Sequence, residues 1–270
     1  MYGKRCMTRF IEDGAPRIAW DEHGNGEPLL LIMGHRWSRR MWHPVHDGLA
    51  ERFRVISFDN RGAGESEAPP PGYPLAEMTR DAVRVMDAAG VDKAHVFGVS
   101  MGGVIAADLA ITYPDRVDRL VLGCTGAVTA DRLRLTPSRR INYVLPDRIV
   151  NALGRPLLYG GMKSTPAIRA DWEMLAGERT TRTGLLGQAH AVSSYGVDMG
   201  DLRRLPHPTL VLHGEKDKVM HAKWGRELAD VIAGAQLTVY PGAGHNFFAT
   251  HGGDVVSDVT GFLTQQRARA

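Results

Sequence analysis

Ser100 has the sequence surroundings of a catalytic nucleophile. It is the central residue of the run G-V-S-M-G at positions 98–102. An apolar run at 95–99 leads into this motif, and a stretch with helical character at 101–113 leads out of it. A tight strand-to-helix turn needs small flanking residues, exposes the serine hydroxyl and places it at the positive end of the helix. The alternative, a glycine-rich loop with an incidental serine, is disfavoured by the strand and the helix on either side.

A serine needs a base, and the base needs an orienting acid, before the hydroxyl can attack a carbonyl group. Asp217 follows the apolar run 208–213, and His245 follows the next such run, 236–240. Glycines precede His245, which sets it apart among the eleven histidines of the chain. Asp217 has a second interpretation as the N-cap of a helix that begins near His221, and one residue can do both. We predict Ser100 as the nucleophile, His245 as the base and Asp217 as the acid.

Strand-like and helix-like stretches alternate along most of the chain. The strand-like runs are 17–21, 29–33, 54–58, 95–99, 117–122, 208–213 and 236–240, and helical patterns lie at 41–52, 75–89, 101–113, 222–232 and 254–266. This alternation indicates parallel β-α-β units, in which ligands bind at the carboxyl ends of the strands. Between about 126 and 206 the rhythm breaks into helical patterns without a clear strand.

These patterns predict an α/β fold with a mostly parallel sheet and helices on both of its faces. The core domain would comprise residues 1–125 and 207–270, and residues 126–206 would form an inserted helical cap, or lid. Ser100, Asp217 and His245 would then all emerge at one edge of the sheet.

The composition excludes several other classes of protein. The 270 residues are 43% hydrophobic and 23% charged, with a net charge of +3, which is too apolar and too weakly charged for a disordered chain. Two cysteines cannot build a disulfide framework or a cysteine-rich zinc site, and they fit a reducing compartment. The N-terminus lacks a signal-peptide pattern, and no apolar run is long enough for a membrane span. We therefore expect a cytoplasmic protein that binds neither nucleic acid nor a membrane. The sequence gives no basis for a prediction of its oligomeric state.

Together, the motifs resemble those of the α/β-hydrolase superfamily, in its branch of serine esterases, lactonases and perhydrolases. Four family motifs occur in order: M-G-H at 33–35, D-N-R-G-A-G-E-S at 59–66, the serine turn at 98–102, and the late loops with Asp217 and His245. The resemblance extends over nearly the whole chain and is weakest in the cap. It implies the α/β-hydrolase fold. A serine at the turn excludes the haloalkane dehalogenases and soluble epoxide hydrolases of this fold, which attack with an aspartate.

The resemblance also implies an oxyanion hole made of two backbone N–H groups. One belongs to Met101, the residue after the nucleophile, and the other to His35, in the loop after the strand 29–33. Many relatives carry His-Gly where this chain has Met33-Gly34. Because the donor is a backbone group, this departure need not impair catalysis, but it leaves open whether the His35 imidazole faces the substrate. The turn 59–66 carries carboxylates and a serine, yet the resemblance assigns it a structural role.

Five aromatic residues are candidates for a substrate pocket: Trp37, Trp42, Trp172, Tyr195 and Phe247. Such residues could equally form the ordinary core by which the cap packs on the main domain, so both interpretations stay open.

The expected activity is that of a serine hydrolase that cleaves a small to medium hydrophobic carboxylic ester or lactone through an acyl-serine intermediate. This chemistry needs no metal and no organic cofactor, and no convincing metal-ligand spacing occurs. One alternative is a carbon–carbon bond hydrolase or a cofactor-free perhydrolase that uses the same triad. Another is a non-catalytic ligand receptor built on this fold.

Overall fold

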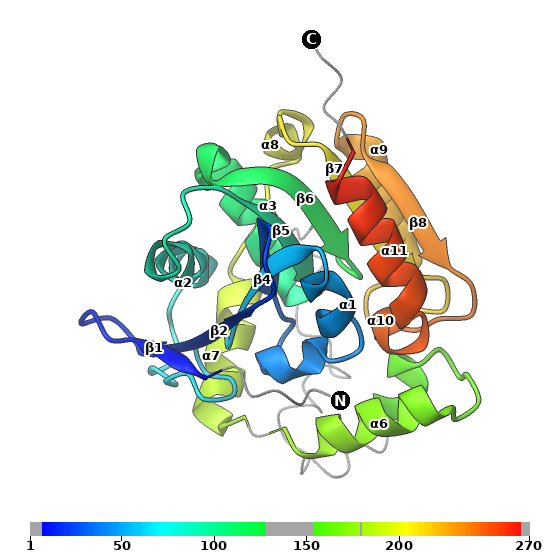
Figure 1. Ribbon diagram of the computed structural model, residues 1–270, viewed down its shortest axis with the longest axis horizontal. Helices are drawn as coiled ribbons and strands as arrows, with labels where there is room; N and C mark the ends of the chain where they lie inside the picture. Colours follow the sequence, from blue (N-terminus) through cyan, green and yellow to red (C-terminus); the bar gives the residue numbers. More distant parts are fainter. Residues whose placement is uncertain (1–6, 128–153, 179, 266–270) are drawn as a thin grey trace.

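One eight-stranded sheet forms the centre of the molecule (Figure 1). The computed structural model describes residues 7–127, 154–178 and 180–265. The strands follow the spatial order β1-β2-β4-β3-β5-β6-β7-β8; β1, β2 and β4 pair antiparallel, and the other neighbours pair in parallel. Their bounds are β1 Arg9–Ile11, β2 Ile18–His23, β3 Glu27–Ile32, β4 Phe53–Phe58, β5 Ala94–Val99, β6 Val117–Gly123, β7 Thr209–Gly214 and β8 Gln236–Tyr240. The predicted mostly parallel sheet is confirmed.

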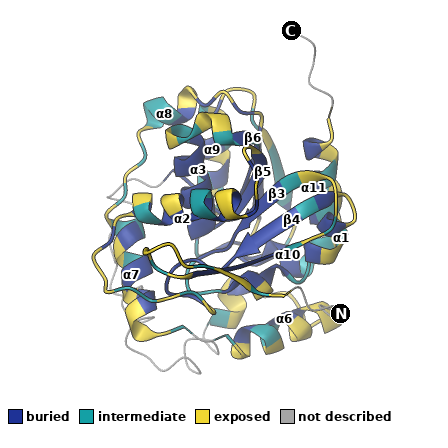
Figure 2. Cartoon of the chain, turned by 60° about the vertical axis from the view of Figure 1, so that its left-hand side comes forward, coloured by how far each residue is buried: buried dark blue, intermediate teal, exposed yellow. Residues whose placement is uncertain are grey.

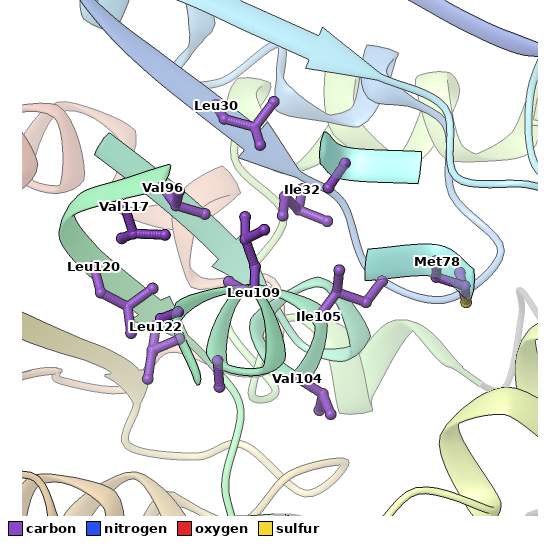
Figure 3. Packing of buried hydrophobic residues seen from close by; sticks show 14 of the residues in the cluster. Leu30, Ile32, Met78, Val96, Val104, Ile105, Leu109, Val117, Leu120 and Leu122 are labelled. Atoms are coloured by element: carbon purple, nitrogen blue, oxygen red, sulfur yellow. The ribbon is translucent and has the colours of Figure 1, made fainter. Parts of the chain in front are cut away.

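Helices cover both faces of the sheet, and the central strands are therefore apolar on both sides. In β3, Leu29 and Leu31 join one hydrophobic cluster, whereas Leu30 and Ile32 join the other. Figure 3 shows the second cluster, in which Ile32 lies near Ile105. The central strands are buried while the outer sides of the helices are exposed (Figure 2). The helices of the main domain are α1 His46–Ala50 and α11 Gly252–Leu263 on the first face, and α2 Leu75–Ala88, α3 Met101–Thr112 and α9 Ala222–Val231 on the second.

The described elements of the predicted cap are all helical. They are a short helix at 154–158, α6 Pro166–Ala176, α7 Arg182–Ser193 and α8 Met199–Arg203. Helix α6 contacts two short elements of the main domain, the 3-10 helix η1 at Arg39–Trp42 and α10 at Phe247–Thr250 (Figure 1). Residues 128–153 and 179 of the cap lie outside the described part of the chain. The boundaries at 126 and 206 thus remain a prediction.

Four local features differ from the sequence-based expectation. The single helix expected at 41–52 is two short elements, η1 and α1, separated at Pro44, whose missing N–H and fixed φ interrupt a helix. The edge strand β1 and the helix α10 were not expected; both are short, and short elements carry little periodicity. A second 3-10 helix, η2, spans Pro114–Arg116. No helix in the described part of the chain has the length and apolar character needed to cross a bilayer.

Candidate active site

The predicted nucleophile lies at a sharp, strained turn between β5 and α3. Ser100 has φ 55° and ψ −120°, a conformation that a residue with a side chain keeps only when its surroundings hold it. The flanking glycines are required for steric reasons. A Cβ atom on Gly98 would overlap the carbonyl oxygen of Gly102, and one on Gly102 would overlap the carbonyl oxygen of Ile32. The glycines thus let β5, α3 and β3 meet at Ser100.

His245 connects Ser100 to Asp217. Its Nε2 lies 3.1 Å from Ser100 Oγ, and its Nδ1 lies 2.8 Å from Asp217 Oδ2. An ionised carboxylate only accepts hydrogen bonds, so Nδ1–H donates to Asp217 and Nε2 is left to accept the Ser100 hydroxyl proton. The structure therefore brings the three predicted side chains together in the geometry of a nucleophile, a base and an orienting acid.

Asp217 is buried and held by several donors. Its Oδ1 accepts from the backbone N–H groups of Val219 at 2.8 Å and Met220 at 2.9 Å, while His213 Nε2 lies 3.3 Å from Oδ2. Burial alone would raise the pKa of Asp217, but His245 and His213 outweigh it and hold the pKa well below its ordinary value. The carboxylate is thus ionised at neutral pH. It caps the turn 217–220, whereas the N-cap of α9 is His221.

The electrostatic surroundings of His245 favour its protonated form. Burial by itself lowers the pKa of His245, but the Asp217 carboxylate raises it by more, and the neighbouring Cys124 thiol adds to this effect. The net result is a pKa well above the ordinary value of 6.5. An imidazolium that forms when His245 accepts the serine proton is therefore stabilised in place.

The two segments that carry the predicted oxyanion donors both adjoin Ser100. A Cβ atom on Gly34, the residue before His35, would lie 3.2 Å from Ser100 Cβ, so the loop after β3 passes directly against the serine. Met101 is the first residue of α3, where backbone N–H groups have no partner within the helix. The His35 imidazole points elsewhere: its Nε2 lies 3.2 Å from the carbonyl oxygen of Leu185, to which Nε2–H donates. Burial lowers the pKa of His35 to about 4, so this ring is neutral at pH 7.

Two of the five pocket candidates are core residues in this structure. Trp42 is fully buried, with its ring centroid 4.8 Å from that of Phe97. Phe247 is fully buried and stacked on Tyr240 at 5.1 Å between centroids. Neither side chain has exposed surface to offer to a ligand, so the core-packing interpretation applies to both.

The other three candidates lie where the predicted cap meets the rest of the chain. The Tyr195 hydroxyl donates to Asp108 Oδ1 of α3 at 2.9 Å, which gives it a structural role. Trp37 and Trp172 are half-buried and pack against the cluster that contains Trp42. These two keep enough exposed surface to remain pocket candidates.

Asp171 of α6 is a buried acid that the sequence analysis missed. It accepts hydrogen bonds from the Tyr159 hydroxyl at 2.6 Å, from Asn246 Nδ2 at 2.6 Å and from His43 Nε2 at 3.0 Å. Asn246 directly follows His245, so these hydrogen bonds connect helix α6 of the predicted cap to the loop that carries His245. In the sequence, Asp171 is simply an aspartate within the amphipathic helical pattern 166–176. Because aspartates in helices are usually exposed, this pattern does not indicate that Asp171 is buried.

One further group with metal-ligand chemistry occurs in the described ranges: His23, His46 and Asp47. The two imidazole rings are stacked, with 4° between their planes and 5.6 Å between their centroids. The lone pairs of a histidine lie in the plane of its ring, so two stacked rings do not direct them at one point. We therefore assign no metal to this group.

The sequence matches two known families over most of its length. Residues 22–157 match the family described as alpha/beta hydrolase fold, and residues 190–270 match the one described as TAP-like protein. The chain belongs to the α/β-hydrolase family. The predicted superfamily is thereby confirmed.

Three relatives of this α/β-hydrolase carry different activities in their names. The chain is 30% identical to the putative carbamate hydrolase RutD of Caulobacter segnis, with 90% of this chain and 94% of that one aligned. It is 32% identical to 2-hydroxymuconate semialdehyde hydrolase of Pseudomonas sp. strain CF600, over 98% and 96% of the two chains. The solved structure of a thermophilic esterase from Thermogutta terrifontis has a TM-score of 0.83 at 26% identity, over 95% and 98%. Membership of the α/β-hydrolase family thus implies hydrolysis of a small molecule without defining which bond is cleaved.

Proposed function

We propose that this α/β-hydrolase is a serine hydrolase that cleaves a small to medium hydrophobic carboxylic ester or lactone. The observation that carries the proposal is a pair of hydrogen-bonding contacts made by His245. Its Nε2 lies 3.1 Å from Ser100 Oγ, and its Nδ1 lies 2.8 Å from Asp217 Oδ2. The expected oxyanion donors are the backbone N–H groups of His35, which follows Gly34 next to Ser100, and of Met101, which follows Ser100 itself.

The reaction proceeds in two acyl transfers. Ser100 Oγ attacks the carbonyl carbon while His245 Nε2 takes its proton, and the carbonyl oxygen becomes an oxyanion held by the two backbone N–H groups. His245 then gives the proton to the leaving alkoxide, and the acyl group stays on Ser100. Water, deprotonated by His245, attacks the acyl-serine and releases the acid. In a lactone, the leaving alkoxide and the acid belong to one ring-opened product.

Apolar surroundings support a hydrophobic substrate. Trp37, two positions after the predicted oxyanion donor His35, and Trp172 of α6 are half-buried and keep apolar surface for a ligand. The similarity to a thermophilic esterase points to esters. The similarity to a carbamate hydrolase also fits, because esters and carbamates both present a carbonyl carbon to the serine.

The test is hydrolysis of p-nitrophenyl esters of increasing acyl length, together with a panel of lactones. We expect turnover by the wild-type protein and none by Ser100→Ala, with the preferred acyl length giving the size of the pocket. Ester turnover that persists in Ser100→Ala would refute the acyl-serine mechanism.

The similarity to 2-hydroxymuconate semialdehyde hydrolase supports a second candidate function, cleavage of a carbon–carbon bond. Its substrate can be assayed directly against the same two proteins. Turnover of the semialdehyde with no turnover of any ester or lactone would favour this candidate. Peroxide-dependent halogenation would instead indicate a perhydrolase, and a folded protein inert in all assays would indicate a receptor.

A further inference from the structure

The loop that carries the predicted oxyanion donor His35 is anchored to the main domain at both of its ends. We call residues 33–39 the oxyanion loop. At its start, Asn60 Nδ2 donates to the carbonyl oxygen of Met33 at 2.8 Å. At its end, the backbone N–H of Arg39 donates to Asp59 Oδ1 at 2.7 Å. Both anchors come from the turn 59–66 after β4.

The middle of the oxyanion loop is held by residues of the cap. The backbone N–H of Arg36 donates to Gln188 Oε1 at 2.7 Å, and the Thr180 hydroxyl donates to the Arg36 carbonyl oxygen. Glu178 accepts from the Ser38 backbone N–H at 2.6 Å and from the Ser38 hydroxyl at 2.8 Å. The partners are separated by between 140 and 152 positions in the sequence, so only docking of the cap brings them together.

Arg36 is where this support is most needed. Its φ is 68°, in the left-handed region that is unfavourable for a residue with a side chain. A strained residue keeps such a conformation only when its neighbours fix it. Both polar groups of the Arg36 backbone are bonded to the cap, and Arg36 directly follows the predicted donor His35. The direction of the loop at the donor thus depends on these contacts.

Helix α7 places Gln188 by an unusually close backbone contact. A Cβ atom on Gly184 would overlap the carbonyl oxygen of Gly62, so the helix lies directly on the turn 59–66. Gln188 is four residues further on and therefore projects from the same side of α7. Its side chain is fully buried, and its Nε2 donates to the Arg61 carbonyl oxygen at 2.9 Å while its Oε1 accepts from Arg36. One amide thus bridges the turn and the loop.

We propose that Gln188 is a positioning residue that holds the oxyanion loop, so that docking of α7 completes the oxyanion hole. This inference rests on the proposed function in one respect, the assignment of the His35 N–H as an oxyanion donor. Gln188 acts through the backbone of Arg36 and does not contact the reacting atoms itself. Its loss should therefore slow formation of the oxyanion while leaving ground-state binding almost unchanged.

The test compares Gln188→Met, which keeps the length of the side chain but removes both hydrogen bonds, with the wild-type protein. Thr79→Val is the matched control, since it removes a buried hydroxyl that donates to Asp108 at 2.5 Å, between α2 and α3. Two rates are measured: turnover of the best p-nitrophenyl ester, and phosphonylation of Ser100 by a fluorophosphonate, whose phosphoryl oxygen also uses the oxyanion hole.

We expect Gln188→Met to lower kcat and the phosphonylation rate by about 10-fold or more, with KM within about twofold, since complete loss of one oxyanion donor costs about 100- to 1,000-fold. Thr79→Val should keep wild-type rates even if it melts earlier. Hydrogen exchange at the Arg36 amide should accelerate in Gln188→Met and not in Thr79→Val. A folded Gln188→Met protein with both rates within twofold of wild type overturns the proposal.

Three further outcomes are distinguishable. If Gln188→Met does not fold, Thr180→Val tests the same support at a half-buried position, and unchanged rates and exchange in that variant overturn the proposal. If the wild-type protein hydrolyses no ester but Ser100 is phosphonylated in a manner that depends on Gln188, the ester activity is wrong and the positioning role stands. If Ser100 of the wild-type protein is not phosphonylated, both proposals fail.

Discussion

Replacing Asp217 by asparagine tests the proposed triad most sharply, because the structure predicts how the new amide is oriented. Oδ1 of Asp217 accepts two backbone N–H groups, from Val219 at 2.8 Å and from Met220 at 2.9 Å. In Asp217→Asn the carbonyl oxygen must remain on these donors, since turning the amide would direct its NH₂ group at them. The NH₂ group therefore takes the position of Oδ2, which lies 2.8 Å from His245 Nδ1.

That orientation reverses the roles of the two imidazole nitrogens. Nδ1 must accept from the amide, so the proton moves to Nε2, the atom 3.1 Å from Ser100 Oγ. A protonated Nε2 cannot accept the serine proton. We expect the acylation rate to fall by about 10³- to 10⁴-fold. This corresponds to an increase in the activation free energy of about 4–5 kcal/mol.

The assay is stopped-flow acylation of Ser100 by a p-nitrophenyl ester, with circular dichroism as the measure of folding. Asp217→Glu does not preserve the two backbone contacts, so the informative control is Ser100→Ala, which defines the background rate. An Asp217→Asn protein that is folded and acylates within tenfold of wild type would refute the orienting role of Asp217. A different acid would then have to serve His245.

Three other outcomes follow from the same geometry. Because the pKa of His245 lies above its ordinary 6.5 and the base must be neutral, kcat/KM should rise with pH to a midpoint above 6.5, and a midpoint at or below that value would contradict the electrostatic role of the acid. Ser100→Ala should lower kcat by about 10⁴-fold or more while changing the free energy of unfolding by less than about 1 kcal/mol, as measured by activity assays and urea unfolding. Asp171→Ala leaves the Tyr159 hydroxyl and the Asn246 amide without their buried acceptor; at about 1–3 kcal/mol for each unsatisfied donor, the free energy of unfolding should fall by about 2–6 kcal/mol, and a loss below about 1 kcal/mol in urea would show that the network is not a structural tie.

Much of the fold was predictable because buried parallel strands leave a direct signal. A run such as Leu29–Ile32 is apolar on both faces, and glycine or a turn ends it at the edge where the chemistry lies. The turn at Ser100 was predictable for a steric reason, since Gly98 and Gly102 have no room for a Cβ atom. The region after Trp37 was harder to predict. The apolar spacing at 41–52 is typical of one helix, and this spacing alone does not show that Pro44 divides the segment into η1 and α1.

Side-chain placement within the site was only partly predictable. Ser100, Asp217 and His245 could be named because each follows a strand that ends at the same edge of the sheet. The aromatic candidates could not be sorted, because an apolar residue near an active-site loop has the same sequence pattern whether it lines a pocket or fills the core. In the structure Trp42 and Phe247 are fully buried in the core, each against a neighbouring aromatic ring.

The sequence by itself determined which residues end the strands of this α/β-hydrolase, since hydrophobic runs and sterically required glycines are local properties of the chain. Only the tertiary structure decided which distant segments support the site. Gln188 contacts Arg36 across 152 positions, and Asp171 contacts Asn246 across 75. Such contacts depend on how the cap helices pack against two loops of the main domain, and neither residue differs in its own sequence surroundings from a polar residue on a solvated helix.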